Sequence, residues 1–196
     1  MKRVSVFTIL ALVGFAFTSP QAEKQIKVDA TKTQINWTGY KVTGQHTGTL
    51  QLNSGSFIYD EGVLTGGSFE VDMNSLTVTD LEGDMAGKLK GHLMSADFFG
   101  VEKFPTASFN ITKVVPQGPN RYKVIGDLTI KETTKEIRFN TTVDQSSGVP
   151  VASAKITLDR SDFNIRYGSG SFFDNLGDKT IYDDFDLNLT VVGASK

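Results

Sequence analysis

The sequence predicts an all-β domain, built as an antiparallel sandwich or a closed barrel, with a single short helix. Apolar and polar residues alternate with a period of two in many short segments, which is typical of strands with one buried face. Turn residues separate these segments, as in NSG, DEG, TGG, PQGPN and SSGVP. No strand-helix alternation indicates a parallel sheet, and no repeat or linker divides the chain.

The N-terminal segment has the layout of a secretory signal peptide. Lys2 and Arg3 precede a largely apolar run at residues 4–17, and small or polar residues follow. The run is shorter than the ~20 residues that a membrane span needs. We therefore expect a signal peptide at residues 1–22, no membrane span, and a periplasmic or secreted mature domain at residues 23–196. The alternative is an uncleaved membrane anchor.

Composition limits how this domain is stabilised and what it binds. The chain has no cysteine, so burial of apolar surface replaces the disulfides of many exported proteins. The mature length is enough for one substantial core. The formal net charge is −2 before the basic leader is removed, which indicates no nucleic-acid partner.

Each alternating segment places its apolar side chains on one face, because neighbouring residues of a strand point to opposite sides. In chain order the residues predicted to face inward are Ile35 and Trp37, Leu50 and Leu52, Phe69, Val71 and Met73, Phe109 and Ile111, Tyr122, Val124, Leu128 and Ile130, Ile137, Phe139 and Val143, Ala154, Ile156 and Leu158, and Phe185, Leu187, Leu189 and Val191.

Asn-x-Thr triplets begin at Asn36, Asn110, Asn140 and Asn188. In a eukaryotic secreted protein they would be glycosylation acceptors. All four lie inside predicted strands, so we interpret them as outward-facing pairs on either side of an inward-facing residue.

Residues 79–93 have helical periodicity instead. Leu81, Met85, Leu89 and Leu93 recur every four residues and form one stripe, and Thr79 with Glu82 matches a capping box. Glycines at positions 83, 87 and 91 lie roughly opposite this stripe, and each costs up to ~1 kcal/mol of helix stability. We expect a weak helix that covers an opening of the sheet structure.

Aromatic residues gather at the next junction, GHLMSADFFGVEKFPTASF, residues 91–109. Phe98, Phe99, Phe104 and Phe109 could fill an ordinary core or line a pocket for an apolar ligand. A closed barrel of ~8 strands is just wide enough for either outcome. If Phe98 and Phe99 are extended, they face opposite sides, so that one lines a channel and the other packs the helix against the barrel.

The sequence gives no convincing signal for catalysis, a metal or a cofactor. It has neither a cysteine nucleophile nor a Gly-x-Ser-x-Gly elbow. His46 and His92 form no metal-ligand motif, and we interpret both as structural or surface residues. The acidic residues between Asp174 and Asp186 invite a calcium site, but they lack the spacing of a calcium loop.

Three segments resemble the YceI-like family of exported bacterial lipid-binding proteins. They are the junction quoted above, GDLTIKETTKEIRF at residues 126–139, and LDRSDFNIRYGSG at residues 158–170. Glu132 stands where the family usually has glycine. The N-terminal third agrees more loosely, with features displaced in GQHTG.

The resemblance implies a lipocalin-like antiparallel β-barrel of about eight strands, with one short helix near an end. It implies an elongated apolar channel that binds an isoprenoid chain or a similar long amphiphile, and it carries over no catalytic residues. Arg160 and His46 share strand parity with the inward-facing Leu158 and Leu50, so either could meet a polar head group, although an ion pair is the more usual role for Arg160.

We therefore expect a periplasmic carrier or sequestering protein, not an enzyme, that holds a long-chain lipid and no cofactor. The alternatives are an enzyme that modifies such a lipid and a filled structural or stress-response barrel without a ligand. A homodimer remains open. The predicted ligand-binding residues are Trp37, His46, Leu89, Leu93, Phe98, Phe99, Phe104, Phe109, Leu128, Ile130, Phe139, Ile156, Leu158, Arg160 and Phe163.

Overall fold

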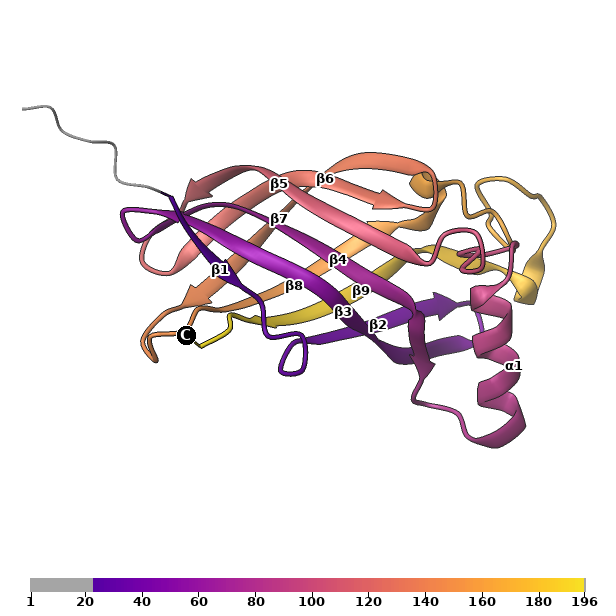
Figure 1. The fold of residues 1–196 in the computed structure, drawn as a ribbon. Coiled ribbons are helices and arrows are strands. Elements are labelled where there is room, and N and C mark those ends of the chain that lie inside the picture. Colours follow the sequence, from indigo (N-terminus) through magenta and orange to yellow (C-terminus); the bar gives the residue numbers. More distant parts are fainter. Residues whose placement is uncertain (1–22, 196) are drawn as a thin grey trace, which may run out of the picture.

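In the computed structural model, which describes residues 23–195, the strands form one antiparallel sheet that closes on itself (Figure 1). The neighbour order is β1-β3-β2-β9-β8-β7-β6-β5-β4, and an additional pairing of β3 with β4 closes the ring. The strands are β1 (Lys24–Lys27), β2 (Gln34–Lys41), β3 (Gly44–Asp60), β4 (Val63–Val78), β5 (Thr106–Pro116), β6 (Arg121–Ile130), β7 (Thr133–Asp144), β8 (Val151–Asp159) and β9 (Ile181–Val192).

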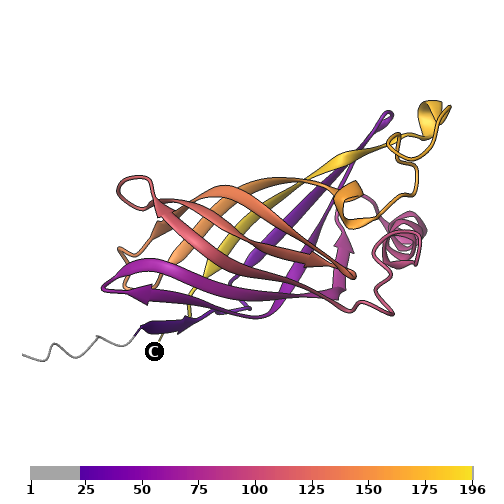
Figure 2. The ribbon, with the colours of Figure 1, turned by 90° about the horizontal axis from the view of Figure 1, so that it is seen from above.

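Strands β2 to β9 make an eight-stranded ring, because the short β1 shares an edge of β3 with β2. β2 pairs with the first part of β3, and β1 pairs with residues 56–59 near its end. The ribbon seen from above shows the strands wrapped around a common axis (Figure 2). The predicted all-β barrel with one helix is confirmed.

The period-two pattern also predicted the outward face. Asn36, Asn110, Asn140 and Asn188 lie in β2, β5, β7 and β9, and all four are exposed. This confirms that the Asn-x-Thr triplets straddle inward-facing residues of the strands.

β3 departs from simple alternation. Its pairing with β4 shifts between Thr49 and Gln51 and again between Leu52 and Ser54. The bulged strand therefore presents Leu52 to the interior before the shift and Phe57 and Tyr59 after it, because a bulge inserts one residue and reverses the parity.

Helix α1 (Gly83–Met94) lies across one end of the barrel (Figure 1). The predicted start at Thr79 with a capping box is wrong: Glu82 precedes the helix, and no side chain caps it. Thr79 instead continues the sheet, since its backbone N–H donates to the Thr47 carbonyl over 2.9 Å. This pairing holds residues 79–80 beside β3 and delays the helix.

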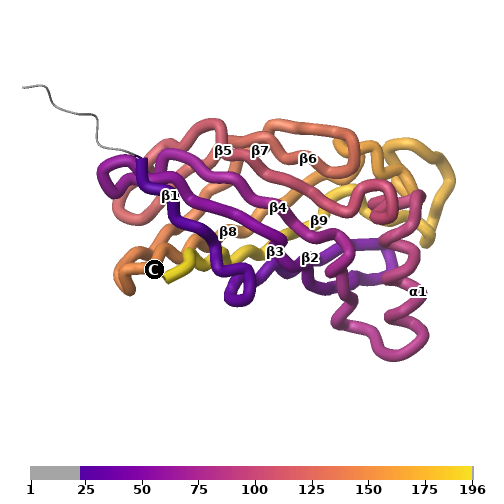
Figure 3. Tube along the Cα trace, viewed as in Figure 1, coloured from indigo at the N-terminus to yellow at the C-terminus, as the bar shows by residue number. Residues whose placement is uncertain are grey.

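The two termini of the described chain lie at the opposite end, where the traces of β1 and of the C-terminal residues run together (Figure 3). A buried cluster of Phe57, Tyr59, Leu64, Tyr122 and Val143 fills that end. We call it the closed end.

The helical end, which we call the mouth, contains a second buried cluster: Met73, Phe98, Val101, Ala107, Ile130, Phe163 and Ile165. A long connection joins β8 to β9 there and includes two short 3-10 turns, η1 (Arg160–Phe163) and η2 (Gly177–Lys179).

The predicted signal peptide, residues 1–22, lies outside the described residues. Across residues 23–195, no helix is long and apolar enough to cross a membrane.

Candidate ligand-binding site

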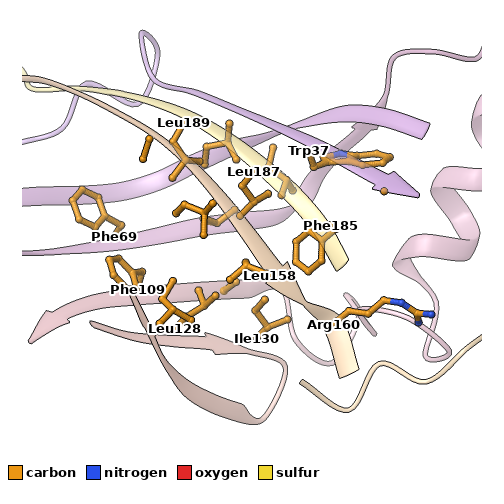
Figure 4. A pocket seen from close by; sticks show the side chains of 18 of the residues that line it. Trp37, Phe69, Phe109, Leu128, Ile130, Leu158, Arg160, Phe185, Leu187 and Leu189 are labelled. Carbon is orange, nitrogen blue, oxygen red and sulfur yellow. The ribbon is translucent and has the colours of Figure 1, made fainter. Parts of the chain in front are cut away.

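The barrel encloses a cavity of about 360 Å³ between its two buried clusters. Every strand from β2 to β9 contributes to the lining, and α1 covers part of it. Figure 4 shows side chains from several strands converging on this space, with Phe69 and Phe109 toward one end and Arg160 at the other. The volume lies within the ~300–1,000 Å³ of typical small-molecule sites.

The exposure of the inner side chains shows that the barrel is hollow. Phe109, Leu128 and Phe139 point inward and line the cavity, yet all three are only partly buried. In a filled core such side chains would lose nearly all their accessible surface, as Val143 does at the closed end, where it is 0% exposed. The structure thus excludes the filled barrel.

A belt of aromatic rings crosses the cavity on the side of the closed end. The ring of Phe57 lies 5.4 Å from that of Phe69, Phe69 lies 6.5 Å from Phe109, and Phe109 lies 5.6 Å from Phe139, measured between centroids. Phe109 lies flat against β6 because Gly126 has no side chain: a Cβ there would be 2.6 Å from Cζ of Phe109. These rings form the floor of the cavity.

Trp37 forms part of the side wall. Its indole Nε1–H donates to the carbonyl of Thr77 over 3.2 Å and so ties β2 to the end of β4. The ring packs against Gly48, where a Cβ would lie only 2.5 Å from the indole. Trp37 is 9% exposed, and its apolar face belongs to the cavity lining.

At the mouth, α1 contributes Leu89, His92 and Leu93 to the lining. The ring of His92 makes edge contacts with Phe98 at 5.0 Å and with Tyr167 at 4.4 Å. The helix stripe predicted from the sequence therefore covers the opening in its second half, while Met85 in the first turn is 61% exposed.

Phe98 and Phe99 both line the cavity, so the prediction that only one of them does is wrong. The two residues lie in a turn after α1, in which the N–H groups of Phe98 and Gly100 both donate to the carbonyl of Ser95. Because the backbone is not extended there, adjacent side chains do not point to opposite faces. Their ring centroids are 6.3 Å apart.

Arg160 lies on the polar side of the mouth. Its guanidinium donates to the carbonyls of Tyr182, Ile165 and Ile181, and it lies 3.1 Å from Oδ1 of Asp183. Burial lowers the pKa of Arg160, and the neighbouring carboxylates of Asp183 and Asp159 oppose that change. In Figure 4 the charged group points away from the apolar side chains. The buried ion pair, not a free head-group contact, is the role that this geometry supports.

His46 lies at the other side of the mouth, where its Nδ1 is 2.8 Å from Oδ2 of Asp80. Desolvation alone would raise the pKa of Asp80, but hydrogen bonds from the Thr47 N–H and from His46 outweigh it, so the pKa is lowered. The contact fixes the segment that leads into α1.

Asp186, one of the acidic residues near the C-terminus, makes its contacts on the outer wall. Asp186 in β9 accepts hydrogen bonds from Tyr40 and Thr157 and pairs with Lys155 at 2.9 Å. The Thr157 and Lys155 contacts lower the pKa of Asp186. Within residues 23–195, no group of three or more acidic or histidine side chains is placed to hold a metal ion.

All but two of the predicted ligand-binding residues line the cavity. Phe104 does not, because it lies in the turn before β5, under Lys103 and against Gly100. Phe163 does not either: the chain leaves β8 at Asp159, so strand parity ends before Phe163, which packs in η1 at 1% exposure.

Sequence reasoning missed several lining residues. His92 was interpreted as structural or surface, although helical spacing places it beside Leu89 and Leu93. Phe57 was missed because the bulges of β3 reverse its parity; Gly55 inside the strand pattern is the available signal. Lys41 and Tyr182, at strand ends beside the mouth, carried no signal.

Comparison with known proteins agrees with this architecture. UPF0312 proteins are similar over most of the chain: one from Vibrio cholerae is 29% identical over 186 residues, covering 88% of this chain and 94% of that protein. One from Pseudomonas putida is 30% identical over 155 residues, covering 76% and 73%.

Two solved structures have the same fold. Burkholderia cenocepacia BcnA superposes with a TM-score of 0.66 at 22% identity, covering 85% of this chain and 99% of that one. A polyisoprenoid-binding domain from Saccharophagus degradans, implicated in plant cell wall breakdown, superposes with a TM-score of 0.67 at 14% identity, covering 87% and 98%. The model of the YceI-like domain matches residues 26–193, and the chain therefore belongs to the YceI-like family.

Proposed function

We propose that the protein binds a long-chain amphiphile, such as a polyisoprenoid, inside the barrel and acts as an exported carrier or sequestering protein. The observation that carries the proposal is the cavity itself, whose wall is apolar from the aromatic floor to α1. The similarity to a polyisoprenoid-binding domain supports the choice of ligand class.

The energetics of binding follow from the lining. Each CH₂ group moved from water into an apolar site contributes ~0.8 kcal/mol, so a long chain binds without a charged anchor. The basic lining residues, which are Lys41, His46, His92 and Arg160, lie at the mouth. The chain therefore enters tail first, toward Phe69 and Phe109, and its polar head remains beside α1.

The rival proposal is an enzyme that modifies such a lipid, which needs an acid/base pair beside the chain. The candidate pair nearest to the cavity is His46 with Asp80, but only His46 belongs to the lining, and both side chains are 27% exposed at the mouth. Incubation of the purified protein with isoprenoid alcohols and mass spectrometry of the products separates an enzyme from a carrier.

The binding proposal is tested with a substitution that fills the cavity. Ala154 in β8 lines it, while the neighbouring Ser153 is exposed on the outer wall. We expect Ala154→Phe to reduce co-purified lipid at least about tenfold, since the new ring occupies the space of the chain, whereas Ser153→Phe retains it. The measurement is mass spectrometry of organic extracts from protein purified without detergent.

Saturable emission changes of Trp37, the only tryptophan, report binding in the same variants. The proposal would be contradicted if Ala154→Phe and Ser153→Phe retained equal amounts of lipid. It would also be contradicted if the unmodified protein contained no lipid and the emission of Trp37 did not respond to added isoprenoid.

Export is the second part of the proposal, supported by the leader-like pattern of residues 1–22. Expression of the full chain in a Gram-negative host should give a periplasmic protein shortened near Ala22. An intact N-terminus in the membrane fraction would contradict export.

A further inference from the structure

Large apolar side chains are exposed mainly at one end of the described chain. With the exception of Val63 at the closed end, the exposed ones are Val42, Met85, Tyr167, Phe172, Phe173 and Tyr182, each between 40% and 61% exposed. We call these six residues the apolar rim. A soluble protein exposes such residues singly, and a group of them marks an interaction surface.

Three chain segments bring the rim together around the mouth. Val42, in the turn between β2 and β3, donates its N–H to the Thr180 carbonyl over 3.2 Å, which joins that turn to the β8–β9 connection. The connection reaches α1 through Tyr167, whose ring lies 4.4 Å from that of His92. Figures 1 and 2 show α1 and the connection at the same end of the barrel.

The rim is continuous with the cavity. Tyr182 belongs to the lining and is also 51% exposed. Met85 is on the same helical stripe as Leu89 and Leu93, which line the cavity, so the stripe runs from the interior out to solvent. An apolar chain leaving the cavity meets these side chains first.

We propose that the apolar rim docks the mouth onto the surface of a lipid bilayer, with Phe172, Phe173 and Met85 inserted among the acyl chains. The inference rests on the proposed function, because a bound lipid chain must enter from a membrane. Passage through water would expose the chain at ~0.8 kcal/mol per CH₂, and direct contact between mouth and bilayer avoids that exposure.

Charge identifies the kind of bilayer contact. Beside the two phenylalanines, Arg166 lies over the ring of Phe172 at 4.8 Å, and Lys179 lies in η2. Asp174 and Asp178 lie in the same connection, so the charges of this segment balance. Docking should therefore depend on insertion of apolar side chains, and only weakly on anionic lipid or salt. Aromatic and long cationic side chains would lie at the membrane interface.

The experiment measures sedimentation of the mature protein with phosphatidylcholine vesicles. The variant Phe172→Ser/Phe173→Ser should weaken vesicle binding about tenfold or more, whereas Val63→Ser, an equally exposed apolar site at the closed end, should leave it unchanged. Addition of phosphatidylglycerol or of 0.5 M salt, a range that strongly screens surface charges, should change binding less than twofold.

Further measurements separate the possible failures. The rim variant should still retain co-purified lipid but transfer it between vesicles more slowly. The proposed bilayer contact is overturned if the protein does not bind vesicles, or binds only vesicles that contain phosphatidylglycerol. In either case, lipid that co-purifies with the protein leaves the proposed function intact. If the unmodified protein is a dimer and the rim variant is a monomer, the apolar rim binds a second copy of the chain, and the bilayer contact is overturned. Absence of lipid from both proteins, together with no response of Trp37 to added isoprenoid, refutes the proposed function instead, whatever the vesicles show.

Discussion

At the closed end, the inward side chains of Phe57, Tyr59, Leu64 and Val143 are at most 3% exposed, and they interlock across the barrel. At the mouth, α1 has no fully buried residue, and Met85 in its first turn is 61% exposed. The same strands run through both ends. The difference teaches that the closed end and the buried cluster beside the β8–β9 connection stabilise the barrel, while the helix over the opening remains loosely packed and can admit a ligand.

The sharpest test of this comparison removes one ring from each end. Phe57→Ala should lower the free energy of unfolding by ~3–5 kcal/mol, because a cavity is left in a well-packed cluster. Phe99→Ala should cost less than half as much, since this ring is only partly buried beside existing space, but it should weaken lipid binding more. Urea unfolding measures the loss of stability, and lipid titration measures the loss of lipid affinity. Equal losses of stability would break the comparison.

A second test uses pH at the closed end. The hydroxyl of Tyr59 is buried and has no hydrogen-bond partner among the described residues, and burial raises the pKa of Tyr59 to about 12. The folded state thus holds this proton more tightly than the unfolded chain, whose tyrosines titrate near pH 10. The contribution of Tyr59 to stability should be fully present below pH ~10 and fall by roughly 1–3 kcal/mol as pH rises toward 12.

The control for this titration is Tyr59→Phe, which removes the unpaired hydroxyl. It should be as stable as the unmodified protein at pH 7, or more stable, and should lose most of the alkaline decline. Chemical denaturation at a series of pH values measures both. An unchanged alkaline decline in Tyr59→Phe would assign it to other groups.

The smallest expected effect concerns the helix at the mouth. Gly87 and Gly91 have open space where a Cβ would lie, so alanine at each position should stabilise α1 by up to ~1 kcal/mol. Because the helix covers the cavity, the double variant should also exchange lipid more slowly. Amide hydrogen exchange in α1 and the rate of lipid transfer check this, with Gly66→Ala, in β4 beside the closed end, as the control for transfer. Faster exchange of lipid would contradict the role of a soft cover.

Much of the fold could be predicted from residue patterns, because a closed barrel with one buried face repeats the same alternation in every strand. Trp37, Leu128 and Leu158 were placed on the inner wall by parity alone. The pattern failed where the backbone left the strand or gained a residue: at Phe104 and Phe163 outside strands, and at Phe57 beyond the bulges of β3.

The mouth was the least predictable part of the site. Neither strand nor helix periodicity applies in the turn that holds Phe98 and Phe99. The N–H groups of Phe98 and Gly100 donate to the Ser95 carbonyl, and the shape of this turn sets the direction of both rings. The saturation of Arg160 by three carbonyls also depends on the path of the β8–β9 connection, which no local pattern specifies.

The glycine behind Phe109 has a consequence for how this barrel could change in evolution. An alanine at position 126 would place its Cβ 2.6 Å from the ring and 2.5 Å from the carbonyl oxygen of Asn110, so both the ring and the backbone of β5 would have to move. The position of the Phe109 ring beside the cavity therefore depends on the absence of a side chain at position 126. We expect that a relative with alanine at this position would have less space in its lumen for an apolar chain.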